Sequence, residues 1–285
     1  MIFGEISAFI SIAEKIKGIL KKSHNRDELI STRLINLCNA HGVARYQIPA
    51  VLGNSITHDD VKSDESFLRV INEKILNDAC FMFGVNRDWL DGASKKVYDS
   101  KHFYKSPQKF NNFISELLSS TNAQSLSGIL ITPLSMCRNT ESLLLIQEVV
   151  SDGYYRYYFC NGWIFSYWKS RAYLSACIAT CWRNDIFVHG VKVKTNYLDK
   201  IATGEKLLDF GSAGIANING IRWHAVDLTS CPDTYLDGID PEQGNFGLIS
   251  ALSLWLELEE KGYMNSNNHL FNSRKEFIAK LNNIK

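Results

Sequence analysis

The sequence carries almost no net charge, because 31 lysine and arginine residues are balanced by 30 aspartate and glutamate residues. Proteins that bind nucleic acid without sequence preference concentrate positive charge for contact with phosphates. Up to Lys105 there are fifteen basic and thirteen acidic residues, an excess of only two. The charge therefore gives no support to strong nonspecific binding of nucleic acid.

The sequence also lacks repeats, low-complexity tracts and the common catalytic signatures. Neither a GxxxxGK phosphate loop nor a GxSxG nucleophile motif occurs. Cys177 and Cys181 lie one helical turn apart, but no second cysteine or histidine pair stands at zinc-site spacing. We interpret them as small buried hydrophobic residues. We predict no enzymatic activity, no metal and no cofactor.

Residues 206–228 are similar to the cofactor loop of methyltransferases. In this reading a strand leads to Asp209 and Gly211, and Asp227 ends a second strand. Only eighteen positions separate the two acids, which is too few for an ordinary helix plus a strand. The Asn219-Gly220 dipeptide favours a hairpin turn instead.

The seven cysteines are odd in number and scattered, unlike the dense, even framework of small secreted domains. We therefore expect reduced thiols and a cytoplasmic protein. Residues 1–22 do not resemble a signal peptide, because lysines follow the apolar stretch and two glutamates interrupt it. This segment is also too short and too charged to cross a bilayer, so we expect no transmembrane segment there.

The apolar residues of segment 1–22 recur at alternating steps of four and three, which predicts an amphipathic helix for packing or oligomerisation. Docking onto its own domain, a homodimer seam and attachment to a membrane surface are the alternatives that the pattern leaves open.

Residues 23–98 have the spacing of a small helical domain. A first helix ends at Gly42 and a second, shorter one ends at Gly53. An apolar stripe over residues 67–83 predicts one long helix that ends at Gly84.

The segment LNDACFMFGVNRDWLDG, from Leu76 to Gly92, resembles the closing part of the lambda-repressor-like (Xre-type) helix-turn-helix family. In that family a helix ends in a Phe-Gly-Val turn, and a short helix with a Trp-Leu pair seals the core. The resemblance extends from roughly Ser31 to Gly92 and implies a DNA-binding transcriptional regulator.

In this family the third helix reads base edges while the second approaches the phosphates. The stretch SITHDDVKS, residues 55–63, occupies the place of the third helix. Asp59 and Asp60 depart from the pattern, because carboxylates repel phosphate, although a carboxylate can accept a hydrogen bond from cytosine. The resemblance implies that the residues contacting double-stranded DNA are Arg45, Tyr46, Gln47, Ser55, Thr57, His58 and Lys62.

A homodimer or larger homo-oligomer is expected, because one short recognition helix reads too few base pairs. The alternative is a non-enzymatic adaptor or assembly protein, in which the helix-turn-helix-derived domain binds a protein partner.

The polar residues 94–107 predict a linker before a second domain, residues 107–285. In that domain Asp152-Gly153 and Asn161-Gly162 predict two successive hairpins between strands. An apolar face over residues 107–120 predicts a helix, and the apolar run over 169–185 predicts a buried one. Two further helices are expected over 244–262 and 273–281.

The predicted fold is therefore multi-domain: an all-α helix-turn-helix domain followed by an α+β domain with an antiparallel sheet. The second domain would sense a ligand or hold a homodimer together.

Overall fold

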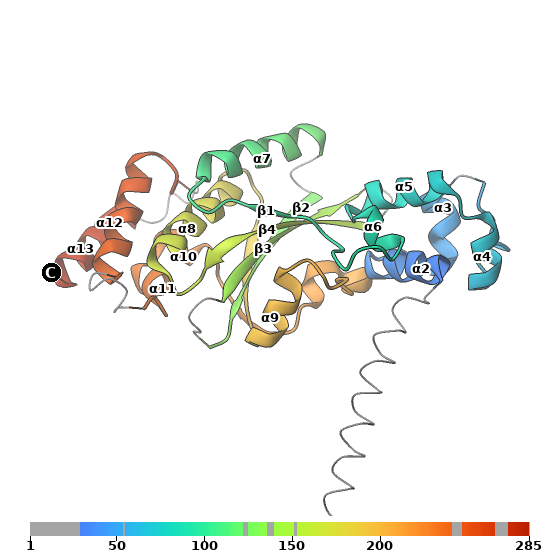
Figure 1. The fold of residues 1–285 in the computed structure, drawn as a ribbon. Helices are drawn as coiled ribbons and strands as arrows, with labels where there is room; N and C mark the ends of the chain where they lie inside the picture. Colours follow the sequence, from blue (N-terminus) through green and yellow to red (C-terminus); the bar gives the residue numbers. More distant parts are fainter. Residues whose placement is uncertain are drawn as a thin grey trace, which may run out of the picture.

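The computed structural model describes residues 29–284, except for 54, 122–124, 136–139, 151–152, 241–246 and 266–272. The amphipathic helix predicted over residues 1–22 lies outside this part. A central sheet stands between a group of short helices at one end of the molecule and two longer helices at the other (Figure 1). Within the described ranges no helix is long and apolar enough to cross a membrane.

The helices at the first end are short and are separated by glycine turns or capping residues. They are α2 (Ile30–Ala40), η1 (Arg45–Gln47), α3 (Ile48–Leu52), α4 (Asp64–Val70), α5 (Glu73–Phe83) and α6 (Arg87–Leu90). The single helix expected over 67–83 is divided, because the Asn72 side chain accepts a hydrogen bond from the Ile75 N–H and starts α5. Gly84, with φ +68°, ends α5 as predicted.

Among the described residues, six strands form one sheet in the order β1-β4-β3-β2-β5-β6. They are β1 (Ser100–His102), β2 (Leu126–Pro133), β3 (Glu141–Val149), β4 (Tyr155–Ile164), β5 (Val188–Val193) and β6 (Ile221–Trp223). Three neighbouring pairs are antiparallel, whereas β1 runs parallel to β4 and β5 runs parallel to β2. The prediction of an antiparallel sheet was therefore wrong, because the sheet is mixed.

The connecting helices explain the parallel pairs. Helix α8 (Trp168–Arg183) follows β4 and carries the chain across the sheet to β5, and α7 (Pro107–Ser120) connects β1 to β2 in the same way. A helical crossover of this length returns the chain in its original direction, whereas a two-residue hairpin reverses it. Both helices were expected from the sequence, but their consequence for strand direction was not.

The hairpin expected at Asn161-Gly162 does not form, because β4 continues through both residues. Ser142 pairs with Trp163 and Leu144 pairs with Cys160, so two residues of β4 oppose Leu143 alone. This is a β-bulge, and the φ of +98° at Gly162 provides the unusual backbone geometry there. The other expected reversal, between β3 and β4, is confirmed by their antiparallel pairing.

The segment 94–107 is part of the sheet rather than a linker. It contains β1 at the edge of the sheet, and Val97 and Tyr98 before it are buried. One continuous hydrophobic core joins the short helices to the sheet face that carries Ile129, Leu145 and Val191. The description as a multi-domain protein is therefore not supported.

Both faces of the sheet are covered, which explains why its central strands are almost continuously apolar. The short helices, α9 (Thr195–Ala202) and residues 207–218, which include η3 (Gly211–Asn217), contribute to the core on one face. Helices α7 and α8 cover the other face. Four helices pack behind α8: α10 (Asp227–Ser230), α11 (Pro232–Leu236), α12 (Gly247–Glu260) and α13 (Ser273–Ile284).

His41 fastens the end of α2 to strand β4. Its Nδ1 donates to the Tyr155 carbonyl oxygen at 2.5 Å, and the Tyr155 N–H donates to the His41 carbonyl oxygen at 3.0 Å. With the proton on Nδ1, Nε2 of the neutral ring accepts from the Tyr98 hydroxyl at 3.0 Å. Burial lowers the pKa of His41 to about 4, so the ring is uncharged at neutral pH.

Arg156 makes a second connection between the short helices and the sheet. Its guanidinium donates to the carbonyl oxygens of Phe81 and Met82 in the last turn of α5. These carbonyls form the negative end of the helix dipole, so a cation is favourable there.

We predict that the fold loses stability between pH 7 and pH 5, because the buried His41 ring stays neutral while the ring of the unfolded chain becomes protonated. The folded-state pKa lies below the unfolded value of 6.5, so the unfolded chain binds the proton first as the pH falls. The free energy of unfolding should fall by about 2 kcal/mol from pH 7, where this stability is present, to pH 5, where most of it is lost. Urea unfolding at both pH values measures it.

His41→Gln should remove most of that pH dependence, although it lowers stability at pH 7. The exposed His58 provides a matched control, and His58→Gln should leave the pH dependence unchanged. An equal loss of stability between pH 7 and pH 5 in the wild type and in His41→Gln would contradict the assignment.

Candidate functional site

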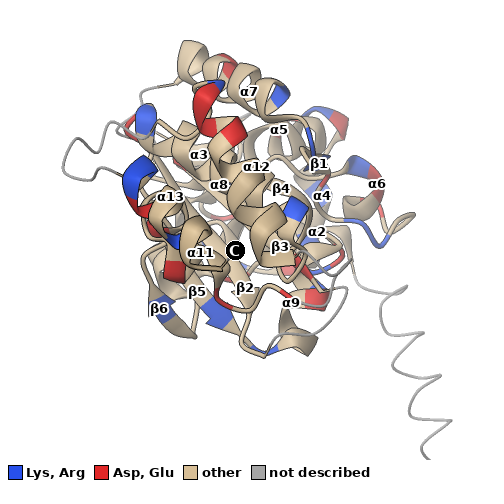
Figure 2. Cartoon of the chain, turned by 90° about the vertical axis from the view of Figure 1, so that its left-hand side faces the viewer, with Lys and Arg blue, Asp and Glu red and all other residues tan. Residues whose placement is uncertain are grey.

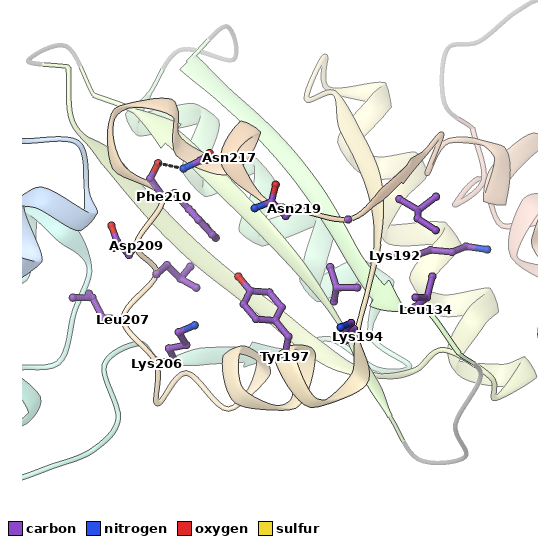
Figure 3. A pocket seen from close by; sticks show the side chains of 14 residues that line it. Leu134, Lys192, Lys194, Tyr197, Lys206, Leu207, Asp209, Phe210, Asn217 and Asn219 are labelled. Atoms are coloured by element: carbon purple, nitrogen blue, oxygen red, sulfur yellow. Dashed lines mark hydrogen bonds between the residues drawn. The ribbon is translucent and has the colours of Figure 1, made fainter. Parts of the chain in front are cut away.

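A pocket of about 630 Å³ opens beside strand β5 (Figure 3). Its walls come from the end of β5, from α9, from residues 206–210 and from the segment that leads into β6. The lining residues are Leu134, Lys192, Val193, Lys194, Tyr197, Lys206, Leu207, Leu208, Asp209, Phe210, Asn217, Asn219, Gly220 and Ile221.

Gln147 of β3 positions the segment that forms one wall. Its buried side-chain oxygen accepts the Ile215 N–H at 2.7 Å. Gly214 passes so close that a Cβ there would lie 2.1 Å from the same oxygen, and its φ of +56° also favours glycine. A buried glutamine on the sheet and a glycine in the loop therefore fix the path of residues 211–217.

The hairpin predicted at Asn219-Gly220 was wrong. Strand β6 pairs with β5, antiparallel, and residues 211–217 form the short helix η3 instead of a strand. Gly220 crosses directly over β5, where a Cβ would lie 2.5 Å from the Lys192 carbonyl oxygen. The glycine is thus needed for close approach of two backbones at the pocket wall.

The pocket is positively charged, because three lysines and one aspartate line it. Lys192 and Lys194 are two positions apart at the end of β5, and Lys206 comes from the segment after α9. The Lys206 ammonium lies 4.9 Å from the centre of the Tyr197 ring, a favourable cation–π geometry. Burial raises the pKa of Tyr197, so its hydroxyl stays protonated.

Outside the pocket, lysine and arginine residues are interspersed with aspartate and glutamate residues on the face that Figure 2 shows.

Lys192 is paired at the rim of the pocket with Asp237, Nζ to Oδ2 at 3.2 Å. Asp237, the residue after α11, is in turn held in place by Arg171. The Arg171 guanidinium donates to the carbonyl oxygens of Phe165, Tyr235 and Asp237. Arg171 is fully buried, and this burial lowers its pKa to about 9.

The residues predicted to contact DNA lie near one another in the chain around α3, but they do not form a recognition helix. Arg45, Tyr46 and Gln47 form η1 before α3, and Ser55, Thr57, His58 and Lys62 follow it in loops and turns. Thr57 and Asp60 hydrogen bond reciprocally through side chain and backbone, which favours a local turn over a helix.

Several of these side chains are occupied within the protein. The Arg45 guanidinium bonds to Asp64, and Lys62 pairs with Asp59 at 2.6 Å. A hydrogen bond from Thr32, followed by the Arg45 contact, holds the pKa of Asp64 below its usual value.

Gln47 accepts the Ala44 N–H at 2.8 Å, whereas Tyr46 is 69% exposed and His58 is also exposed. Their contact with DNA stays a prediction.

The pocket was missed in the sequence because its residues are distributed from position 134 to position 221. The one local signal was the alternation of Lys192 and Lys194, which places both side chains on one face of a strand. No family model, curated protein or solved structure matches this chain.

We predict that Gln147→Ala destabilises the fold by about 1–3 kcal/mol, because the buried Ile215 N–H loses its partner. Urea unfolding measures the change, with Gln108→Ala on the exposed surface of α7 as the control. If both variants were equally stable, the side chain would not support the pocket wall.

Proposed function

We propose that this protein is a ligand-responsive regulator that binds a small molecule in the pocket beside β5. The pocket is the observation that supports this proposal. Its volume lies within the range of about 300–1,000 Å³ that is usual for small-molecule sites, and its lining combines apolar walls with a few polar groups. The proposal assigns no catalytic step to these residues.

A hydrogen-bonded path leads from the pocket to the short helices. The N–H of the lining residue Leu208 donates to the Tyr98 hydroxyl at 3.4 Å, and this hydroxyl donates to His41 at the end of α2. The Tyr155 hydroxyl also donates to the Ser212 carbonyl oxygen at 2.7 Å. A ligand that moves residues 206–212 would therefore act on the junction between helices and sheet, which supports a regulatory role.

We propose that the surface around residues 45–65 contacts the regulated partner, and that this partner is a protein. This surface has more negative than positive charge. Its charged residues are the cations Arg45 and Lys62 and the carboxylates Asp59, Asp60, Asp64 and Glu65. Both cations are already paired with carboxylates. Phosphate would meet a net negative surface, so charge favours a protein over the double-stranded DNA that the helix-turn-helix resemblance implies.

The ligand proposal is tested by thermal unfolding against a library of small metabolites. A compound present at 100 times its Kd should stabilise the fold by about 2.7 kcal/mol, which raises Tm by several degrees. Asn219→Trp fills the pocket from an exposed lining position and should abolish the shift. Asn282→Trp, on the exposed surface of α13, should retain it. Shifts that persist in Asn219→Trp would place the ligand elsewhere.

Binding to random duplex DNA tests the choice of partner. We expect Kd values weaker than about 100 μM at physiological salt, beyond the usual range of nonspecific DNA-binding proteins. Micromolar binding that weakens steeply with salt, and weakens further in Lys62→Gln, would reinstate DNA. Lys109→Gln on α7 serves as the charge-matched control.

A further inference from the structure

We infer that the ligand of the pocket beside β5 is an organic anion with a flat apolar body. This inference rests on the proposed function and adds the chemical class of the ligand. Lys192, Lys194 and Lys206 against Asp209 give the lining a net charge of +2, whereas the whole chain carries +1. A cleft lined by one sign of charge and backed by apolar walls concentrates ligands of the opposite sign.

Lys194 and Lys206 provide the charge that an anion would contact. Lys192 is already paired with Asp237, and in Figure 3 its ammonium points away from the centre of the pocket. Lys194 is exposed at the residue before α9. Lys206 lies over the Tyr197 ring, so an anion beside that ring would be within reach of its ammonium group.

The body of the ligand is defined by the aromatic and apolar walls. In Figure 3 the half-buried Tyr197 ring lies on one side of the space, and the buried Phe210 ring, which packs against Tyr157, forms part of the wall on the other side. Leu134 and Ile221 are lining residues that are 46% and 60% exposed, although large apolar side chains are normally covered. A flat apolar ligand would stack on the Tyr197 ring and cover these two side chains.

Asp209 restricts where the anionic group can lie. Its carboxylate is exposed in the segment that follows Lys206, and in Figure 3 it lies on the side opposite Lys192. Repulsion disfavours an anionic group beside Asp209 and favours one between Lys194 and Lys206. The apolar body then extends towards Phe210.

Two fluorescent probes of similar shape and different charge test this inference. 1-Anilinonaphthalene-8-sulfonate carries a sulfonate, and N-phenyl-1-naphthylamine is its neutral counterpart. Both are titrated into the full chain, the Lys194→Gln/Lys206→Gln double variant, the Lys109→Gln control and the blocking variant Asn219→Trp. Circular dichroism and thermal unfolding confirm that each variant is folded.

We expect the sulfonate probe to bind about tenfold more weakly to the double lysine variant, since each exposed ion pair is worth a factor of about three. The neutral probe should change by less than about twofold. Raising the salt concentration should weaken binding of the sulfonate probe alone. Lys109→Gln should leave both probes unaffected, and Asn219→Trp should abolish binding of both.

The possible failures are distinguishable. If Asn219→Trp blocks both probes but the double lysine variant affects neither, the pocket binds small molecules without preference for anions, and the inference is wrong while the proposed function stands. If neither probe binds, or if binding is insensitive to Asn219→Trp, the proposed function and the inference both fail.

Discussion

His41 is completely buried where α2 meets strand β4, and both of its ring nitrogens have partners there. Phe83 and Tyr157 surround the ring, with centroid distances of 4.9 and 5.0 Å. In these apolar surroundings a charged ring would be costly, so the neutral tautomer with the proton on Nδ1 is the one that satisfies both contacts. The position of the short helices against the sheet depends on this uncharged arrangement.

This junction also explains why two domains were expected, whereas the short helices in fact share a core with one face of the sheet. The helical periodicity of residues 30–90 correctly indicates amphipathic helices, but it does not reveal what their apolar faces pack against. Here those faces share a core with β2, β3 and β5, and Tyr98, from the segment expected to be a linker, forms part of it. A polar stretch of chain can thus contain two fully buried residues, here Val97 and Tyr98.

Local patterns predicted the elements well where one physical signal dominated. The apolar face of α7 and the continuous apolar run of α8 both gave helices in the right places. The glycine dipeptides were less informative, because a glycine with positive φ serves a bulge as well as a turn. Gly162 accommodates a bulge in β4, and Gly220 permits contact with the β5 backbone. Only the pairing of distant strands distinguishes these uses.

The pocket could not be predicted from the sequence because its walls meet only after β5 and β6 have paired. Lys192 and Lys194 gave a local hint, but Lys206 and Phe210 come from a segment after α9, and Gln147 of another strand holds the neighbouring residues 211–217. The predicted DNA-contacting residues show the opposite problem. Their sequence pattern was local and recognisable, yet in the structure Thr57 and Asp60 form a turn and Arg45 pairs with Asp64.

A ligand shifts a protein between two arrangements only as far as it binds them with different affinities. Under the proposed function, the wall of the pocket would respond at Leu208, whose N–H bond to Tyr98, at 3.4 Å, is longer than an ordinary hydrogen bond. A displacement of this wall that lengthens the bond further would cost little at Leu208, but it would leave the Tyr98 hydroxyl supported by His41 alone. The weakest bond of the path therefore lies beside the pocket, and the strongest lies at the junction of helices and sheet. If the proposed ligand moves the wall at Leu208, this order of bond lengths lets the helical surface change while His41 still holds it to the sheet.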